Sequence, residues 1–190
     1  MLFAHETELA LQAAVVLANS AEPPDTMTTV TELDAFFTEY LYTGRHDHDA
    51  TELEEVRALR PALRRLLTSD AEAAAAQVNA MLSRARATPR LVRHGSFDWH
   101  IHATDDDEPL VTRIIVETAM AMIDLIRADE LSRLDLCADA DCEGIVLDLS
   151  RNRSRRYCSI TCGNRNAAAA YRARQSQQTQ PAQTQPAQDR

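Results

Sequence analysis

The chain has 190 residues, of which 45% are hydrophobic and 26% are charged, with a net charge of −9 at pH 7. This length suits one main domain with a small second unit, and the charged fraction is that of a soluble globular protein. No apolar run approaches the ~20 residues that span a bilayer, and the first residues lack the basic and apolar segments of a secretory signal, so we expect a cytoplasmic protein outside the membrane.

Helical periodicity dominates the first 87 residues. The segments with apolar residues at three- and four-residue steps, or with a high alanine content, are 6–19, 31–41, 51–68 and 70–87. We expect Thr31 to begin the second helix and Asp70 to begin the fourth. Thr51 and Glu54 are expected to form a capping box at the third. Pro61 lies inside the third segment and predicts a kink or two abutting helices, because proline disrupts the hydrogen bonding of a helix interior.

The period of the apolar residues changes after the fourth helix. Residues 90–93 and 97–102 alternate between apolar and polar side chains, which predicts a β-hairpin. A long segment, 110–127, follows Pro109 and is apolar on most sides, so it is expected to be the central helix of the domain. We therefore predict an α+β, mainly helical fold, with a helical N-terminal domain over residues 1–130 that contains one β-hairpin.

All four cysteines lie in the last third of the chain: Cys137, Cys142, Cys158 and Cys162. In a cytosolic protein such a cluster binds metal more often than it forms disulfides, although two disulfides or four free thiols are the alternatives. Two closely spaced ligand pairs suit the tetrahedral geometry of zinc. Four thiolates leave no position for water, so the sequence predicts one structural Zn²⁺ ion.

The cysteines define a small module over residues 131–174. Residues 144–149 read as a strand, residues 155–157 as the arm that returns toward the second cysteine pair, and Ser159 as the cap of a helix that runs toward Arg174. This order of knuckle, hairpin and helix predicts a treble-clef-like arrangement. A segment this short has too few large apolar residues for its own core, whereas structural zinc supplies about 10–16 kcal/mol of apparent binding energy.

Several motifs resemble a known pair of domains. The segment 155–165 resembles the CGNR zinc finger, whose signature is Cys162-Gly163-Asn164-Arg165. The segments 55–60, 78–82 and 89–92 resemble the ABATE domain that accompanies this finger. Three residues separate the last two cysteines here, where many members have four, and both thiolates still share one face of a helical turn. The resemblance implies a stress-induced bacterial transcriptional regulator that binds double-stranded DNA.

Charge is segregated along the chain. Residues 1–148 hold 28 acidic residues and 12 arginines, whereas residues 149–174 hold no acidic residue. The basic side chains of the second segment are Arg151, Arg153, Arg155, Arg156, Arg165, Arg172 and Arg174. Guanidinium groups bind phosphate in a bidentate manner and read guanine edges, so we predict that these seven arginines contact DNA. The alternatives are docking of the basic segment onto an acidic protein or the chain's own N-terminal domain, or simple solvation.

Two histidine pairs are further candidates. We expect His46 and His48, in the sequence His-Asp-His-Asp, to lie in a solvated turn. His100 and His102 are expected on the polar face of an exposed hairpin, with a metal or catalytic site as the alternative. The sequence has no phosphate-binding glycine loop, nucleophile elbow or zinc-protease motif, so we predict that the protein is not an enzyme.

Two regions complete the prediction. The N-terminal domain is expected to sense a small-molecule or protein effector, and a small-molecule site would need an apolar pocket between the long helix and the hairpin. Residues 175–190 repeat Thr-Gln-Pro-Ala-Gln and contain no large apolar residue. Such a Gln- and Pro-rich tail is predicted to be disordered.

Overall fold

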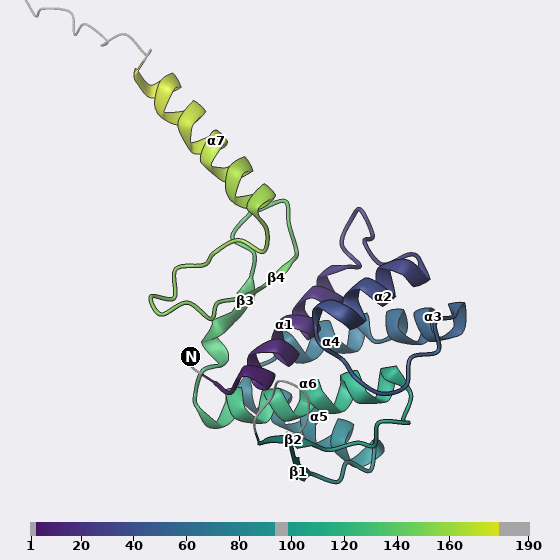
Figure 1. Cartoon of the computed structure of the whole chain (residues 1–190). Helices are drawn as coiled ribbons and strands as arrows, with labels where there is room; N and C mark the ends of the chain where they lie inside the picture. Colours follow the sequence, from purple (N-terminus) through teal and green to yellow (C-terminus); the bar gives the residue numbers. More distant parts are fainter. Residues whose placement is uncertain (1–2, 94–98, 179–190) are drawn as a thin grey trace, which may run out of the picture.

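The computed structural model describes residues 3–93 and 99–178 (Figure 1). The elements of the N-terminal part are α1 (His5–Asn19), α2 (Val30–Glu39), α3 (Ala50–Ala58), α4 (Arg60–Leu67), α5 (Ala71–Arg84), β1 (Arg90–Val92), β2 (His100–His102) and α6 (Leu110–Arg127). A 3-10 turn (Leu131–Arg133), β3 (Leu134–Leu136), β4 (Ile145–Leu147) and α7 (Ile160–Gln178) follow. The predicted α+β, mainly helical fold is confirmed.

Two helix starts differ from the prediction. Helix α2 begins before Thr31, because Thr29 and Glu32 form a capping box. Helix α3 is capped by Asp49 and not by Thr51, and the Asp49 carboxylate accepts a hydrogen bond of 2.8 Å from the backbone amide three residues later. A carboxylate both accepts this bond and interacts favourably with the positive end of the helix dipole, so aspartate is the stronger cap.

The segment predicted as one interrupted helix over 51–68 is two abutting helices. Helix α3 ends at Ala58, and α4 begins at Arg60 with Pro61 in its first turn. A first-turn amide has no partner within the helix, so proline is tolerated at this position. Asp70 caps α5 as predicted and accepts a hydrogen bond of 2.9 Å from the amide of Ala73.

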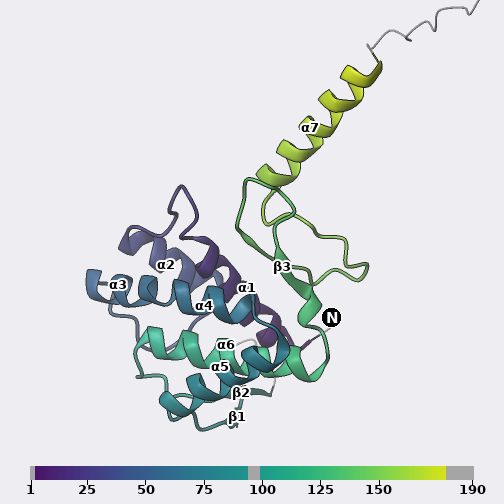
Figure 2. The same ribbon diagram turned by 180° about the vertical axis from the view of Figure 1, so that it is seen from behind.

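Helix α6 is the central helix of the N-terminal domain. It packs against α1 on one side and α5 on the other, which both views show (Figures 1 and 2). Ile114, Met122 and Leu125 on this helix are completely buried, and Leu110 is nearly so. The prediction that the long apolar helix is central is therefore confirmed. Among the described residues, no helix is both long and apolar enough to cross a membrane.

Both sheets are two-stranded antiparallel hairpins. The predicted hairpin forms from β1 and β2, with Leu91 opposite Ile101, while residues 94–98 lie outside the described part. The second hairpin corrects the prediction, because β4 pairs with β3, which precedes the first cysteine, and not with residues 155–157. Leu134 and Leu136 flank Asp135 in a strand-like alternation, whereas the later segment turns at Arg153, which has a positive φ of 48°.

The second hairpin is attached to the helical domain. The side chain of Asn19, at the end of α1, donates a hydrogen bond of 2.8 Å to the carbonyl of Ile145 and accepts one of 2.7 Å from its amide. Ile145 and Leu147 are buried in the same hydrophobic core as α1. Strand β4 is therefore fixed to α1 by both apolar packing and paired hydrogen bonds.

Helix α7 projects away from the rest of the protein (Figure 2). Its 19 residues correspond to a length of about 28 Å. Beyond Asn166, its side chains are exposed as far as residue 176. The helix continues four residues past 174 into the segment predicted to be disordered, and residues 179–190 lie outside the described part.

Candidate metal centre and basic surface

The two cysteine pairs come from opposite ends of the module. Cys137 and Cys142 lie in the loop that joins β3 to β4. Cys158 precedes α7, and Cys162 lies in its first turn, where its amide donates a hydrogen bond of 3.2 Å to the hydroxyl of Ser159. Ser159 therefore caps the helix as predicted, and the capped turn points the last cysteine back toward the loop.

The four sulfurs form one compact cluster, and none of them is in a disulfide. All four lie within 4.8 Å of one another, with 3.5 Å between the sulfurs of Cys142 and Cys158 and 3.8 Å between those of Cys158 and Cys162. Tetrahedral zinc with Zn–S bonds of ~2.3 Å places its sulfurs ~3.8 Å apart. The geometry therefore fits a four-cysteine zinc site.

Backbone and side-chain donors surround these sulfurs. The amide of Gly144 lies 3.3 Å from the sulfur of Cys142, and the amide of Cys158 lies 3.4 Å from that of Cys137. Burial raises the pKa of the Cys158 thiol well above its usual value when no cation is present, and the neighbouring thiols raise it further. A bound cation with amide donors around it is the arrangement that stabilises thiolates in such a cluster.

Gly144 leaves the space that the cluster needs. A Cβ atom at this position would lie 2.7 Å from the sulfur of Cys158 and 3.3 Å from that of Cys142. A methyl group at the first of these distances overlaps the sulfur, so alanine would displace a ligand. The donor set and this close approach both agree with a metal at the centre of the four sulfurs.

Arg165, the last residue of the CGNR signature, is engaged inside the module. Its guanidinium group forms an ion pair of 2.6 Å with Asp139 and lies 3.5 Å from the sulfur of Cys162. Asp139 is only 4% exposed. This arginine thus connects α7 to the cysteine loop, while 48% of its side chain remains exposed.

Two other predicted arginines have partners within the protein. Arg153 lies 2.5 Å from the carboxylate of Glu130 and donates to the hydroxyl of Ser132 at 3.0 Å. The side chain of Arg155 reaches the carbonyls of Tyr157 and Cys158 at 3.5 and 3.3 Å. Both side chains remain exposed, so these contacts leave part of each guanidinium accessible.

The remaining four arginines have no ion pair with any described residue: Arg151, Arg156, Arg172 and Arg174. We call them the unpaired arginines. All four are exposed. Helix α7 carries no acidic residue, so the charged side chains of its projecting part are all basic. The unpaired arginines are the part of the predicted DNA surface that has no competing carboxylate among the described residues.

A four-cysteine hairpin-and-helix module joined to a helical domain defines a two-domain zinc-finger protein. The family model for the CGNR zinc finger matches residues 133–175. The ABATE model, described as "Putative stress-induced transcription regulator", matches residues 11–129. The second match covers more than half of the chain, and the protein belongs to this family. No curated protein matches the sequence significantly.

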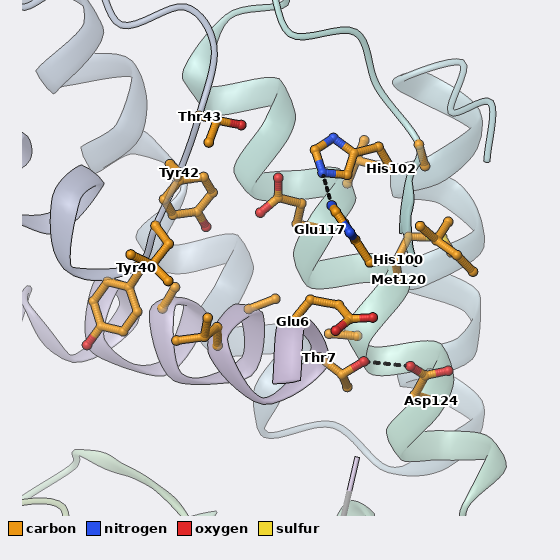
Figure 3. Close-up of a pocket in the computed structure, with 18 residues that line it drawn as sticks. Glu6, Thr7, Tyr40, Tyr42, Thr43, His100, His102, Glu117, Met120 and Asp124 are labelled. Atoms are coloured by element: carbon orange, nitrogen blue, oxygen red, sulfur yellow. Dashed lines mark hydrogen bonds between the residues drawn. The ribbon is translucent and has the colours of Figure 1, made fainter. Parts of the chain in front are cut away.

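The N-terminal domain contains a cavity of about 140 Å³. It lies between α1, α6, β2 and the residues after α2 (Figure 3). The polar side chains around it include Glu6, Thr7, Tyr42, His100, His102, Glu117 and Asp124, and the apolar ones include Leu9, Ala13, Val116 and Met120. A pocket between the long helix and the hairpin, which a small-molecule site would require, is therefore present.

One polar group of this pocket consists of Tyr42, Glu117, His100 and His102, and Glu6, Thr7 and Asp124 lie apart from it (Figure 3). Glu117 lies between Tyr42 and the two histidines (Figure 3), and removal from solvent raises the pKa of its carboxyl to about 7. The hydroxyl of Tyr42 is buried and has no hydrogen-bond partner in the described structure. The Nε2 atoms of His100 and His102 lie 3.0 Å apart, and His100 is buried, so the expected exposed histidine face is wrong for this residue.

The shifted Glu117 pKa predicts a pH effect on stability. Between its usual value of 4.5 and about 7, the unfolded chain loses this proton while the folded chain keeps it, so stability falls as pH rises through that window. We expect Glu117→Gln to remove this fall of the unfolding free energy with pH, and to be about 1–3 kcal/mol more stable than the wild type at pH 8. Urea unfolding at pH 5, 6, 7 and 8 measures the unfolding free energy of the two proteins. The same dependence on pH in both would contradict the raised pKa of Glu117.

The second histidine pair also differs from its prediction. The side chain of His46 is only 5% exposed, and its ring stacks on Phe37 with 4.4 Å between ring centroids. The expectation of a solvated turn is therefore wrong for His46, whereas the side chain of His48 is 63% exposed. The apolar ring of Phe37 on α2 covers the loop, and no pattern within the loop itself indicates this.

Sequence reasoning missed several residues that shape these sites. Asp139, Gly144 and Asn19 support the metal centre and its attachment to α1, and Tyr42 and Glu117 shape the pocket. Asp139 and Gly144 lie inside the cysteine module, and their position next to ligands is a usable signal. Asn19, Tyr42 and Glu117 act through contacts between distant segments, for which one sequence carries no local signal.

Proposed function

We propose that the protein is a DNA-binding transcription regulator whose zinc-stabilised module presents arginines to double-stranded DNA. The observation that carries this proposal is an exposed, acid-free helix that projects from an acidic body. The body, residues 1–148, has a net charge of −16, and residues 149–174 have a net charge of +7. A bacterial, cytoplasmic setting and a role in the stress response are part of the same proposal.

The metal in this proposal is one structural Zn²⁺ ion held by Cys137, Cys142, Cys158 and Cys162. The ion supplies folding energy by joining the β3–β4 loop to the start of α7. Four thiolates complete its coordination, so the chain's residues fix geometry and do not activate water. We propose accordingly that the protein is not an enzyme.

The unpaired arginines favour DNA over other partners. Phosphate contacts from arginine supply most of the affinity for DNA, and an α-helix fits the major groove. Arg172 and Arg174 lie on the projecting part of α7, away from the acidic body. Repulsion between that body and the phosphates leaves the module as the contact surface.

A titration of fluorescently labelled duplex DNA with the zinc-loaded protein tests the proposal. We expect binding at 50 mM salt that weakens steeply toward 200 mM, because arginine–phosphate contacts release counterions. Absence of binding at the lowest salt would overturn it.

Docking on an acidic protein is the second candidate function, and the ion pairs of Arg153 and Arg165 with carboxylates favour it. This candidate predicts that the zinc-loaded protein binds an acidic polypeptide more tightly than DNA.

We also propose that the cavity is an effector site for a small, partly apolar molecule that carries a hydrogen-bond donor. The lining contains three carboxyl groups, Glu6, Glu117 and Asp124, beside an apolar wall. Helix α1 contributes Glu6, Thr7 and Ala13 to the lining, and its other end holds β4 through Asn19. A ligand that shifts α1 would therefore change the position of the metal module.

The bonds of Asn19 make this coupling testable. We expect Asn19→Ala to lose two hydrogen bonds to β4, to destabilise the protein by about 1–3 kcal/mol, and to increase amide exchange in β3 and β4. Gln12→Ala is the matched control, since Gln12 lies exposed on the same helix. Urea unfolding and hydrogen–deuterium exchange measure the two effects. Equal exchange at β4 in both variants would show that Asn19 does not hold the module.

A further inference from the structure

His46 and His48 converge with Asp34 at a point remote in sequence from the cysteines. The Oδ1 atom of Asp34 on α2 lies 2.8 Å from Nε2 of His46 and 2.9 Å from Nδ1 of His48. One ligand atom from each of the three residues lies within 4.8 Å of the others. Neighbouring ligands about 2.1 Å from a common ion lie about 3 Å apart, so these two distances are those of a coordination sphere.

Glu52 determines which nitrogen of His46 carries a proton. Its Oε2 atom lies 2.6 Å from Nδ1 of His46 and accepts hydrogen bonds from the amides of Asp47 and His48 at 3.0 and 3.1 Å. An oxygen that accepts two amide bonds is a carboxylate acceptor, so Nδ1 of His46 is the donor. In the neutral ring, Nε2 is then an acceptor with a lone pair directed toward Asp34.

This Nε2 atom is buried and has no hydrogen-bond partner among the described residues. Its 2.8 Å approach to the Asp34 oxygen is an ion pair when the ring carries both protons, and it is the distance between two ligands of one metal ion when the ring is neutral. Nε2 of the neutral His46 ring and Oδ1 of Asp34 are both acceptors, and they repel at this distance unless one cation binds both. A metal ion coordinated by the two atoms, to one side of the line that joins them, satisfies both.

We propose that Asp34, His46 and His48 bind a divalent first-row transition metal, in a second site separate from the cysteine centre. Two imidazole nitrogens and one carboxylate oxygen suit such an ion and leave positions for water. Glu52 is the positioning residue, because a carboxylate on the other ring nitrogen fixes the orientation of a metal-binding histidine. The same loop continues from Tyr42 and Thr43 in the cavity lining, so the ion would hold that loop against α2.

Metal analysis of the full chain tests this site. Protein with its cysteine centre loaded with zinc is dialysed against micromolar Zn²⁺ or Co²⁺, and bound metal is counted per chain. We expect two equivalents for the wild type and one for His48→Ala, in which the change is at an exposed side chain. Asp34→Asn should also retain only one, and Glu52→Gln should weaken the second site by about 10–100-fold.

Asp47→Asn is the matched control, because this neighbouring carboxylate is exposed and pairs with Arg45 at 2.7 Å. We expect it to keep both equivalents. A single equivalent in the wild type overturns the second site and leaves the cysteine centre intact. A second equivalent that survives in both His48→Ala and Asp34→Asn also overturns it, since the ion would then lie elsewhere. Circular dichroism of each variant verifies that the fold is retained.

Discussion

Removal of zinc with a chelator is expected to unfold the cysteine module while the helical domain remains folded. The buried hydrophobic residues of the module form a small cluster of their own, which consists of Cys137, Val146 and Cys162. This cluster has few apolar neighbours, so the metal provides most of the stability of the module. Apparent zinc-binding energies of about 10–16 kcal/mol indicate the scale of the loss. Hydrogen–deuterium exchange followed by mass spectrometry should show loss of protection in residues 137–144 and from residue 150 to the start of α7, on either side of the strand that packs on α1. Protection in α1 and α6 should persist.

The glycines of the module provide a metal-specific control for this result. Gly144→Ala places a methyl group against the sulfur of Cys158 and is expected to weaken zinc binding by on the order of 100-fold. Gly163→Ala is the matched variant, because the nearest atom to its Cβ would be 3.7 Å away, and it should bind zinc normally. Competition with a chromophoric chelator compares the two. Equal affinities, or unchanged exchange after chelation, would mean that the four sulfurs do not hold the module together.

Substitution of the unpaired arginines by glutamine is expected to lower DNA affinity by on the order of 10²–10³-fold and to reduce the salt slope by about four, one for each contact. These four side chains have no ion pair with a described residue, so the change should leave the fold intact. Fluorescence anisotropy at several salt concentrations measures affinity and slope together.

A charge-matched control separates contact from net charge. Arg65 and Arg84 are exposed arginines on α4 and α5, in the helical domain. Arg65→Gln with Arg84→Gln changes the net charge by the same amount as Arg172→Gln with Arg174→Gln. We expect the first pair to bind DNA like the wild type and the second to bind weakly. Equal losses for the two pairs would indicate a general charge effect in place of a contact surface.

Sequence patterns were sufficient for elements that depend on local chemistry. The abutting of α3 and α4 follows from Pro61, the start of α5 from Asp70, and the cap of α7 from Ser159, because each effect acts within one turn. The cysteine spacing likewise indicated a metal cluster, since ligand pairs a few residues apart must face one another. These predictions required no knowledge of tertiary contacts.

Features that depend on distant segments could not be read in the same way. Strand β4 pairs with β3 because Ile145 and Leu147 enter the core next to α1, which the alternation of the later arginine segment does not indicate. Arg165 pairs with Asp139, 26 residues away, and the charge of the arginine alone does not indicate this contact. His46 is buried by Phe37 on another element. Each of these contacts joins segments that are distant in sequence, so no local pattern indicates it.

Hydrogen–deuterium exchange of the zinc-loaded protein with and without duplex DNA at low salt locates the contact surface directly. The proposed function predicts new protection between residues 151 and 157 and along α7, with none in α2 to α5. Protection confined to the helical domain, or no change while DNA is bound, would contradict a role for the arginine-bearing module in DNA recognition.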